Sequence, residues 1–158
     1  MRDAQAGSAS AVEALFRAHW LSAYRAAYLV IHDASAAEDV AQEAFLAALR
    51  RLDTFDRKRP FGPWLHRIVV NRAIDWSRRR ALRSEVELHE SPVEQGERDV
   101  GADAVAALQR LSPEHRAVIV LRHLLGYTPG EIAHLLELPR GTVNSRLRRG
   151  LDELKGRL

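Results

Sequence analysis

The stretch that decides the fold is residues 128–155, TPGEIAHLLELPRGTVNSRLRRGLDELK. Thr128 and Glu131 have the spacing of a capping box, which predicts that a short helix begins here and ends near residue 136. A four-residue break, 137–140, precedes a second predicted helix over 141–155. Two short helices separated by a tight turn are typical of a helix-turn-helix, whose second helix enters the major groove of DNA.

The last predicted helix has one apolar face and one polar face. At about 100° per residue, Val143 and Leu147 share a side with two later leucines. Gly141 and Thr142 leave the backbone N–H groups of the first turn open to a phosphate. The side opposite the apolar face suits base edges and phosphates, and it carries Gly141, Asn144, Ser145, Arg148 and Arg149. DNA binding is therefore favoured over a merely basic surface helix.

Composition excludes several classes of protein. The 158 residues include no cysteine, which excludes a disulfide scaffold, a thiolate zinc site and a cysteine nucleophile. The longest apolar run, 26–31, is far shorter than the ~20 residues of a membrane-spanning helix, and the N-terminus lacks a signal-peptide core. We therefore expect a cytoplasmic protein without membrane insertion. Abundant alanine and leucine with few β-branched residues favour an all-α chain.

The charges divide the chain into three segments. Residues 1–83 carry 14 Lys/Arg and 9 Asp/Glu, residues 84–103 carry 1 and 7, and residues 104–158 carry 9 and 5. Two basic modules around an acidic connector suggest contact with a polyanion, although solvated helix faces would give a similar pattern. The acidic segment contains Ser91-Pro92 and two glycines, and it is predicted to be a flexible linker reaching at most ~70 Å. We therefore expect an N-terminal domain over 10–83 and a C-terminal domain over 104–158.

Capping signals place the remaining helices. Ser10 and Ser35 each precede a glutamate by three residues and are predicted N-caps, Pro63 suits a first helical turn, and Ser112 precedes Pro113. A C′ glycine, Gly126, is expected to end the helix that Ser112 begins. The other helices are predicted at about 11–31, 36–52, 63–82 and 102–110.

The predicted second helix has an unusual outer face. Leu46 lies in the middle of a charged surface, where it is either a single exposed leucine or part of a protein-binding patch. The sequence leaves these two interpretations equally open. The face consists of Asp39, Gln42, Glu43, Leu46 and Arg50.

The third helix and the loop before it combine aromatic and cationic side chains. Cations for the backbone and aromatic rings for unstacked bases are what single-stranded nucleic acid requires, although two of the three aromatics are expected to belong to the core. The aromatics are Phe55, Phe61 and Trp64, and the cations are Arg57, Lys58, Arg59, Arg78, Arg79 and Arg80. A polar stripe beside the buried one holds Trp64, Arg67, Asn71, Asp75 and Arg78.

Signatures of an enzyme are missing from the sequence. It has no HExxH motif, Walker loop or dinucleotide-binding glycine run, and its seven histidines lack the spacing of metal ligands. We therefore expect neither a catalytic site nor a cofactor. A nucleic-acid enzyme is disfavoured for the same reason.

In combination these motifs resemble the extracytoplasmic-function (ECF) sigma factors, the small two-domain members of the sigma-70 family, over about residues 11–158. Residues 37–45, AEDVAQEAF, are similar to region 2.2 of that family. Phe61, Trp64, Ile68, Asn71, Asp75 and Arg78-Arg79 are similar to regions 2.3–2.4. Leu111-Ser112-Pro113 with Arg116, followed by residues 141–147, GTVNSRL, is similar to region 4.

The resemblance implies a non-catalytic specificity subunit of RNA polymerase that recognises −35 and −10 promoter elements. Asp39, Gln42, Glu43, Leu46 and Arg50 would dock on the β′ clamp helices, while the C-terminal domain would also contact the β flap. The acidic linker would pass through polymerase channels. An anti-sigma factor is a further implied partner.

The resemblance also implies two DNA contact sets. Phe55 and Asn71 would line a pocket for a flipped −10 base, within a set formed by Phe55, Arg57, Lys58, Arg59, Phe61, Trp64, Arg67, Asn71, Asp75, Arg78, Arg79 and Arg80. The −35 set would be Thr128, Arg140, Gly141, Thr142, Asn144, Ser145, Arg146, Arg148 and Arg149. The chain differs from the family in its basic loop 56–60, often small and acidic, and at Glu137, often a glycine.

We thus expect an all-α chain of two domains that places core polymerase on a promoter. A stand-alone helix-turn-helix regulator, binding duplex DNA only, is the main alternative. Tight promoter binding without polymerase would favour it.

Overall fold

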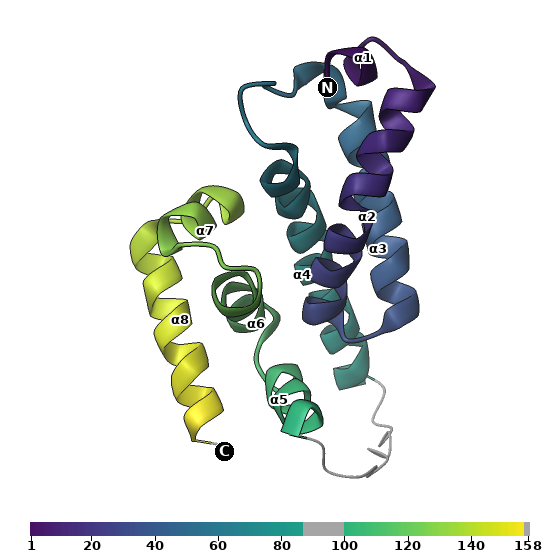
Figure 1. Cartoon of the computed structure of the whole chain (residues 1–158). Helices are drawn as coiled ribbons and strands as arrows, with labels where there is room; N and C mark the ends of the chain where they lie inside the picture. The colour runs from purple at the N-terminus through teal and green to yellow at the C-terminus, as the bar shows by residue number, and fades with distance from the viewer. Residues whose placement is uncertain (87–99, 157–158) are drawn as a thin grey trace. The chain divides into compact units, whose positions relative to one another are not determined.

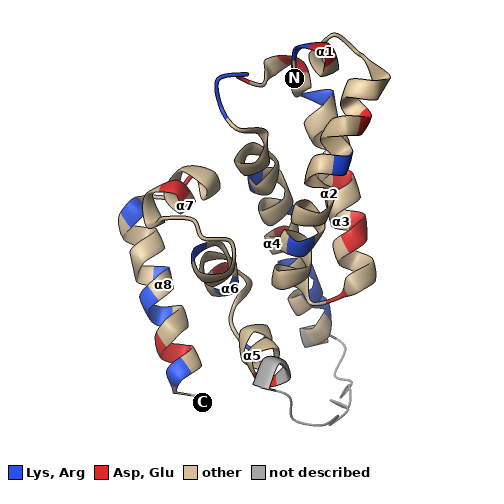
Figure 2. Ribbon diagram, in the orientation of Figure 1, with Lys and Arg blue, Asp and Glu red and all other residues tan. Residues whose placement is uncertain are grey.

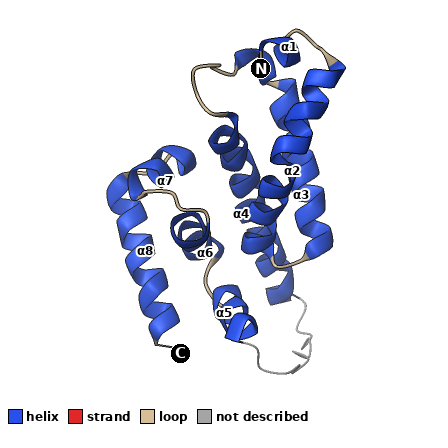
Figure 3. Ribbon diagram, viewed as in Figure 1, coloured by secondary structure: helices blue, strands red, loops and turns tan. Residues whose placement is uncertain are grey.

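The computed structural model describes residues 1–86 and 100–156, and in both ranges the regular structure is entirely helical, as predicted (Figures 1 and 3). The chain divides into two compact units, Met1–Ala73 and Ile74–Leu158. This division falls inside a helix, and the expected limits 10–83 and 104–158 stay a prediction. Most of the expected acidic linker, 84–103, lies outside the described residues.

The first unit is built on three long helices preceded by a short one. Helices α2 and α3 pack closely along their length, and the one-turn η1 joins α3 to the loop before α4 (Figure 1). The elements are α1 (Arg2–Gln5), α2 (Ala9–Ile31), α3 (Ala34–Arg50), the 3-10 turn η1 (Leu52–Thr54) and α4 (Phe61–Val86), whose C-terminal half belongs to the second unit.

Small residues allow α2 and α3 to approach each other. Their facing sides are buried and mostly alanine, so the backbones come close, and the rings of Phe16 and Trp20 pack against Phe45. The buried set includes Ala23, Ala26, Ala27, Val30, Ala37, Val40, Ala41, Ala44 and Ala48. Phe16 and Tyr28 recur at helical spacing with the other large apolar residues of α2, which predicts burial, yet they are 41% and 37% exposed.

Both predicted N-caps of this unit are two residues too late. Ser8 caps α2, with its hydroxyl accepting from Ala11 N at 3.4 Å, and Asp33 caps α3, accepting from Ala36 N at 3.0 Å. An N-cap residue requires extended backbone, which Ser8 and Asp33 adopt, whereas Ser10 and Ser35 already lie inside their helices. Helix α1 was not predicted.

The second unit contains the shorter helices. They are α5 (Val100–Gln109), α6 (Pro113–Ile119), the π-helical turn η2 (Val120–Leu124), α7 (Pro129–Leu136) and α8 (Arg140–Lys155). Ser112 caps α6, accepting from His115 N at 3.2 Å, as predicted. Gly126 follows η2 with φ of 77°, the left-handed conformation expected of a C′ glycine. The core of this unit includes Val118, Leu121, Ile132 and Val143, each fully buried.

A buried guanidinium holds the start of this unit together. Arg116 is only 8% exposed and donates to the carbonyl oxygens of Leu108 and Gln109 at 2.8 Å and of Leu111 at 3.0 Å. These are the last carbonyls of α5 and the turn after it, which have no partner within the helix. Arg116 therefore caps α5 from α6, and a favourable charge meets the negative end of the helix dipole.

Candidate DNA and polymerase interfaces

The helix-turn-helix is formed by α7 and α8 as the sequence predicts. Thr128 and Glu131 make the capping box, with Thr128 N and Oγ1 donating to Glu131 Oε2 at 2.7 and 2.8 Å, and Glu131 N donating back to Oγ1 at 3.3 Å. These bonds also lower the pKa of Glu131. Glu137 ends α7 with φ of 55°, the left-handed conformation in which glycine is usually found.

Helix α8 has one buried and one exposed face, as predicted, except that Ser145, predicted on the polar side, is half-buried. Val143 and Leu147 are buried against the unit, and Gly150 packs so closely on α6 that an added Cβ would lie 3.1 Å from the Ile119 side chain. Ser145 and Arg146 are half-buried at the border between the faces. Arginine and lysine positions recur along α8 (Figure 2). The exposed residues of the predicted set are Thr128, Arg140, Gly141, Asn144, Arg148 and Arg149, while Thr142 is half-buried.

The predicted face of α3 is a continuous exposed surface. Asp39, Gln42, Glu43, Leu46 and Arg50 are all exposed, and Leu46 keeps 48% of its surface open to solvent. Glu43 Oε2 lies 3.8 Å from Arg72 Nη1 of α4, so one edge of this face is tied to the neighbouring helix. The exposed ring of Phe16 packs on Phe45, with ring centroids 5.0 Å apart. The face thus combines an exposed apolar centre with charged neighbours.

The aromatic cluster at the start of α4 is largely core. Phe55 and Phe61 are each 6% exposed, whereas Trp64 is half-buried. The Phe55 ring contacts Trp64 at 4.8 Å and Phe61 at 5.7 Å between centroids. As expected, two of the three aromatics are core residues, but Phe55, the one expected in a base pocket, is one of them. Its ring is covered by its neighbours and presents no open stacking surface.

The loop between Phe55 and Phe61 carries the basic residues. Arg57, Lys58 and Arg59 are exposed. Asp56 organises the loop, because its carboxylate accepts from Lys58 N at 3.0 Å and its carbonyl accepts from Arg59 N at 3.0 Å. The loop therefore displays three cations on a locally hydrogen-bonded turn.

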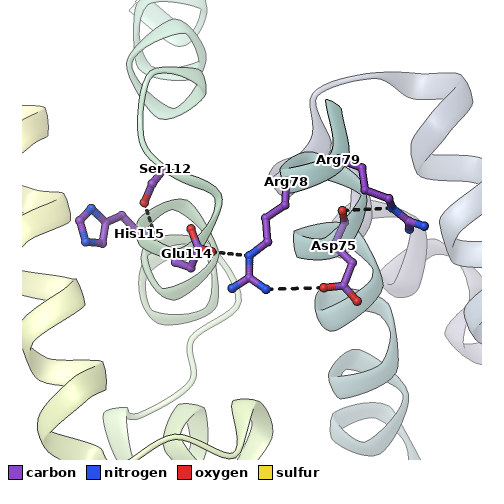
Figure 4. Close-up of polar contacts among 6 residues, drawn as sticks. All are labelled: Asp75, Arg78, Arg79, Ser112, Glu114 and His115. Atoms are coloured by element: carbon purple, nitrogen blue, oxygen red, sulfur yellow. Dashed lines mark hydrogen bonds and ion pairs between the residues drawn. The ribbon is translucent and has the colours of Figure 1, made fainter. Parts of the chain in front are cut away.

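The polar stripe of α4 is only partly accessible. Arg67 and Asn71 are half-buried, and Asp75 and the arginines 78–80 are exposed. Figure 4 shows that Arg78 and Arg79 turn toward partners, with Arg79 Nε donating to Asp75 O at 3.3 Å and Arg78 Nη1 lying 3.7 Å from Asp75 Oδ1.

Two more contacts occupy the end of this stripe. Within the second unit, Arg78 Nε also donates to Glu114 Oε1, and Arg80 lies over the Trp76 ring at 5.2 Å. Burial raises the pKa of Glu114, but the bonds from Arg78 and the backbone outweigh it and the pKa lies below its usual value. Several of the predicted phosphate-binding cations therefore already have protein partners.

Two polar contacts in the structure were not anticipated from the sequence. Gln5 of α1 donates to backbone carbonyls near the basic loop, and Ser22 contacts His66 between α2 and α4. Neither has a sequence motif, because each joins residues more than 40 positions apart. Among the described residues, no group of three or more His, Asp or Glu side chains is placed to hold a metal, and no helix is long and apolar enough to cross a membrane.

Comparison with known proteins identifies the family. The family model of Sigma-70 region 2 matches residues 15–83, and that of Sigma-70 region 4 matches residues 102–154. The ECF RNA polymerase sigma factor SigW of Bacillus subtilis is 33% identical over 155 residues, covering 85% of this chain and 82% of SigW. SigM of Mycobacterium tuberculosis is 36% identical over 153 residues, covering 94% and 78%.

Solved structures agree with this result. CnrH, solved in complex with the cytosolic domain of CnrY, has a TM-score of 0.72 and 31% identity, covering 98% of this chain and 92% of CnrH. The sigma factor RpoE of Bartonella quintana, solved with the anti-sigma factor NepR, shares the fold with a TM-score of 0.71 at 22% identity, covering 91% and 94%.

The chain therefore belongs to the ECF sigma factors of the sigma-70 family. Members of this family are non-catalytic specificity subunits of RNA polymerase, and this protein is accordingly a promoter-directing sigma factor.

Proposed function

We propose that this sigma factor recognises −35 and −10 promoter elements through two separate surfaces and assists strand opening at the second. The observation that carries the proposal is α8, whose apolar side is anchored by Val143 and Leu147 while its outer side is polar and cationic. A helix so anchored can enter the major groove without losing its core contacts.

At the −35 element we assign base contacts to Asn144, Ser145 and Arg148 and phosphate contacts to Arg146 and Arg149. Asn144, Arg148 and Arg149 are exposed on α8, whereas Ser145 and Arg146 are both half-buried at the border between its faces. Phosphate contacts are further assigned to Thr128, Arg140, Gly141 and Thr142 at the start of the two helices.

At the −10 element we assign base and backbone contacts to different residues than the sequence predicts. The exposed cations 57–59 and 78–80 are assigned to the DNA backbone, and the half-buried Trp64, Arg67 and Asn71, with Asp75 beside them, to an unstacked base. Phe55 and Phe61 support that surface from below, because both rings are buried.

We assign polymerase binding to the exposed face of α3, which would dock on the β′ clamp helices. This face is made by Asp39, Gln42, Glu43, Leu46 and Arg50. An apolar centre inside a polar rim is the usual anatomy of a protein interface, and Leu46 has that position. The C-terminal domain would contact the β flap.

Further partners follow from the relatives. CnrH was solved with the cytosolic domain of CnrY and RpoE with the anti-sigma factor NepR, which supports an anti-sigma partner for this chain as well. We place the protein in the cytoplasm, where polymerase and promoter DNA meet, with domains over 10–83 and 104–158.

Run-off transcription with core polymerase on a randomised promoter library tests the proposal. Enrichment of templates with two conserved elements, only when the sigma factor and core enzyme are both present, is the expected result. The stand-alone regulator predicts instead that the chain selects one duplex site equally well without polymerase.

A further inference from the structure

The N-terminal helix α1 holds the base of the basic loop. The Gln5 amide nitrogen donates to two backbone carbonyls, Leu52 O at 2.8 Å and Phe55 O at 2.9 Å. An amide nitrogen has two N–H donors and both acceptors here are carbonyls, so both donors are used in one clamp. Ala4, the residue before Gln5, is 4% exposed, which shows that α1 is packed on the unit.

The clamp acts where the loop begins. Leu52 is the first residue of η1 and Phe55 follows its last residue, and Phe55 N closes the turn by donating to Leu52 O at 3.2 Å. The basic loop 56–60 starts at the next residue, and Phe61 fixes its far end in the core. The rings of Phe55 and Phe61 are 5.7 Å apart, so the two ends of the loop are held together at a closed base.

This arrangement holds both the ring and the backbone of Phe55 in place. Its ring packs on Trp64, which the proposed function places at the unstacked base, and its carbonyl is held by Gln5. A shift of η1 would therefore move both the cations 57–59 and the support beneath Trp64. Helix α1 itself lies outside the matched region 15–83.

We propose that Gln5 is a positioning residue for −10 recognition, and that α1 acts as a brace which pre-orders the basic loop for single-stranded DNA. The inference rests on the proposed function of this loop and α4. Pre-ordering matters because a loop already in its binding conformation loses less conformational entropy when it meets DNA. Gln5 touches neither DNA nor polymerase in this proposal; it acts through η1.

The test compares an acceptor and a donor substituted at Gln5. Gln5→Glu keeps the shape but replaces the donor with an acceptor facing two carbonyls, whereas Gln5→Lys retains donors at similar reach. Ala6, exposed at the end of α1, supplies matched charge controls, Ala6→Glu and Ala6→Lys. All variants are assembled with core polymerase.

We measure the binding affinities of each variant for DNA and for core enzyme, and the rate of amide hydrogen exchange in the loop. We expect Gln5→Glu to weaken holoenzyme binding to a single-stranded −10 oligonucleotide about five- to tenfold relative to Ala6→Glu, the range that loss of one or two hydrogen bonds gives. Binding to core enzyme and to a −35 duplex should not change. Amide hydrogen exchange should accelerate at 53–59, and Gln5→Lys should match Ala6→Lys in both DNA affinity and exchange.

Other outcomes overturn the inference. If Gln5→Glu binds the oligonucleotide as tightly as its control, whether or not its melting temperature falls, the Gln5 hydrogen bonds have no role in −10 recognition. A parallel loss of core, −35 and −10 binding would show general unfolding, and failure of Gln5→Lys to recover would exclude the donor role. Failure of the wild-type holoenzyme to select any −10 sequence would instead refute the proposed function itself.

Discussion

Ser22 Oγ and His66 Nε2 lie 2.7 Å apart and join α2 to α4 inside the first unit. His66 is only 8% exposed, and burial lowers its pKa, with the nearby His19 lowering it further and a hydrogen bond with the Ser22 backbone raising it partly back. Burial therefore favours the neutral imidazole over the protonated one. This contact fixes α4, the helix that carries the proposed −10 surface, against the α2 scaffold.

The His66 environment predicts that the protein is destabilised by mild acid. The unfolded chain takes up a proton near the ordinary histidine pKa of 6.5, while the folded form resists it because its pKa is lower. Stability is therefore fully present above pH 6.5 and declines as the pH falls below that value. Thermal unfolding at about pH 7.5 and about pH 5.5 should show the loss.

His66→Gln should reduce that pH dependence, because glutamine can still bond Ser22 but does not titrate in this range. His19, whose pKa is also lowered by burial, should account for part of what remains. The exposed His123 offers the control His123→Gln. An identical pH dependence in wild type and His66→Gln would show that His66 is not the group responsible.

Arg116→Ala should strongly destabilise the second unit. The substitution removes the guanidinium donor from the carbonyls of Leu108, Gln109 and Leu111, of which Leu108 O keeps the Leu111 N–H, and breaking such a network costs about 3 kcal/mol or more. Arg116→Lys should recover only part of the loss, because one ammonium lacks the fork of a guanidinium. Urea unfolding measures the effect, and exposed Arg110→Ala is the control; an equal cost for both would contradict this account.

Substitutions on the α3 face should separate polymerase binding from folding. Asp39→Arg or Leu46→Glu changes an exposed side chain, so helicity and melting temperature should stay nearly constant. Core-enzyme affinity should fall by about 2 kcal/mol, the scale of an interface hot spot. Glu13→Arg, a charge reversal exposed on α2, is the matched control. Unfolding by either variant, or full core affinity, would remove this face from the interface.

The two arginines at 148 and 149 should have different effects on promoter choice. Arg148→Ala should relax preference at one or two −35 positions, since an arginine paired with guanine provides about 1–3 kcal/mol of discrimination. Arg149→Ala should weaken all sequences alike and reduce the salt dependence by roughly one unit. Promoter selection with each holoenzyme distinguishes them, and reversed behaviour would mean that α8 is rotated in the groove.

Asn71→Ala and Phe55→Ala should both impair transcription initiation, the first through strand opening and the second through folding. Asn71→Ala should slow open-complex formation on duplex promoters and matter much less on templates already mismatched around the start site. Phe55→Ala removes a buried ring and should cost about 3–5 kcal/mol of folding stability, with defects on both templates. An equal defect of Asn71→Ala on both templates would place Asn71 in folding or docking.

Local patterns in the sequence were enough to predict the helix-turn-helix. The Thr128–Glu131 capping box, the break at Glu137 and the two-faced pattern of α8 depend on neighbouring residues, and all appear in the structure. The exposed face of α3 could be predicted for the same reason. Charged residues at helical spacing share one side of a helix, and that side faces solvent.

Tertiary packing decided what local patterns could not. The sequence pattern did not show that Phe16 is exposed or that Phe55 is buried: Phe16 lies at the edge of the Trp20 and Phe45 rings, whereas the rings of Phe61 and Trp64 contact Phe55. The Gln5 clamp, the Ser22–His66 contact and the Arg116 cap likewise lack a reliable sequence signal. Each satisfies a polar group that burial has removed from water, and which groups become buried is known only once the helices have packed.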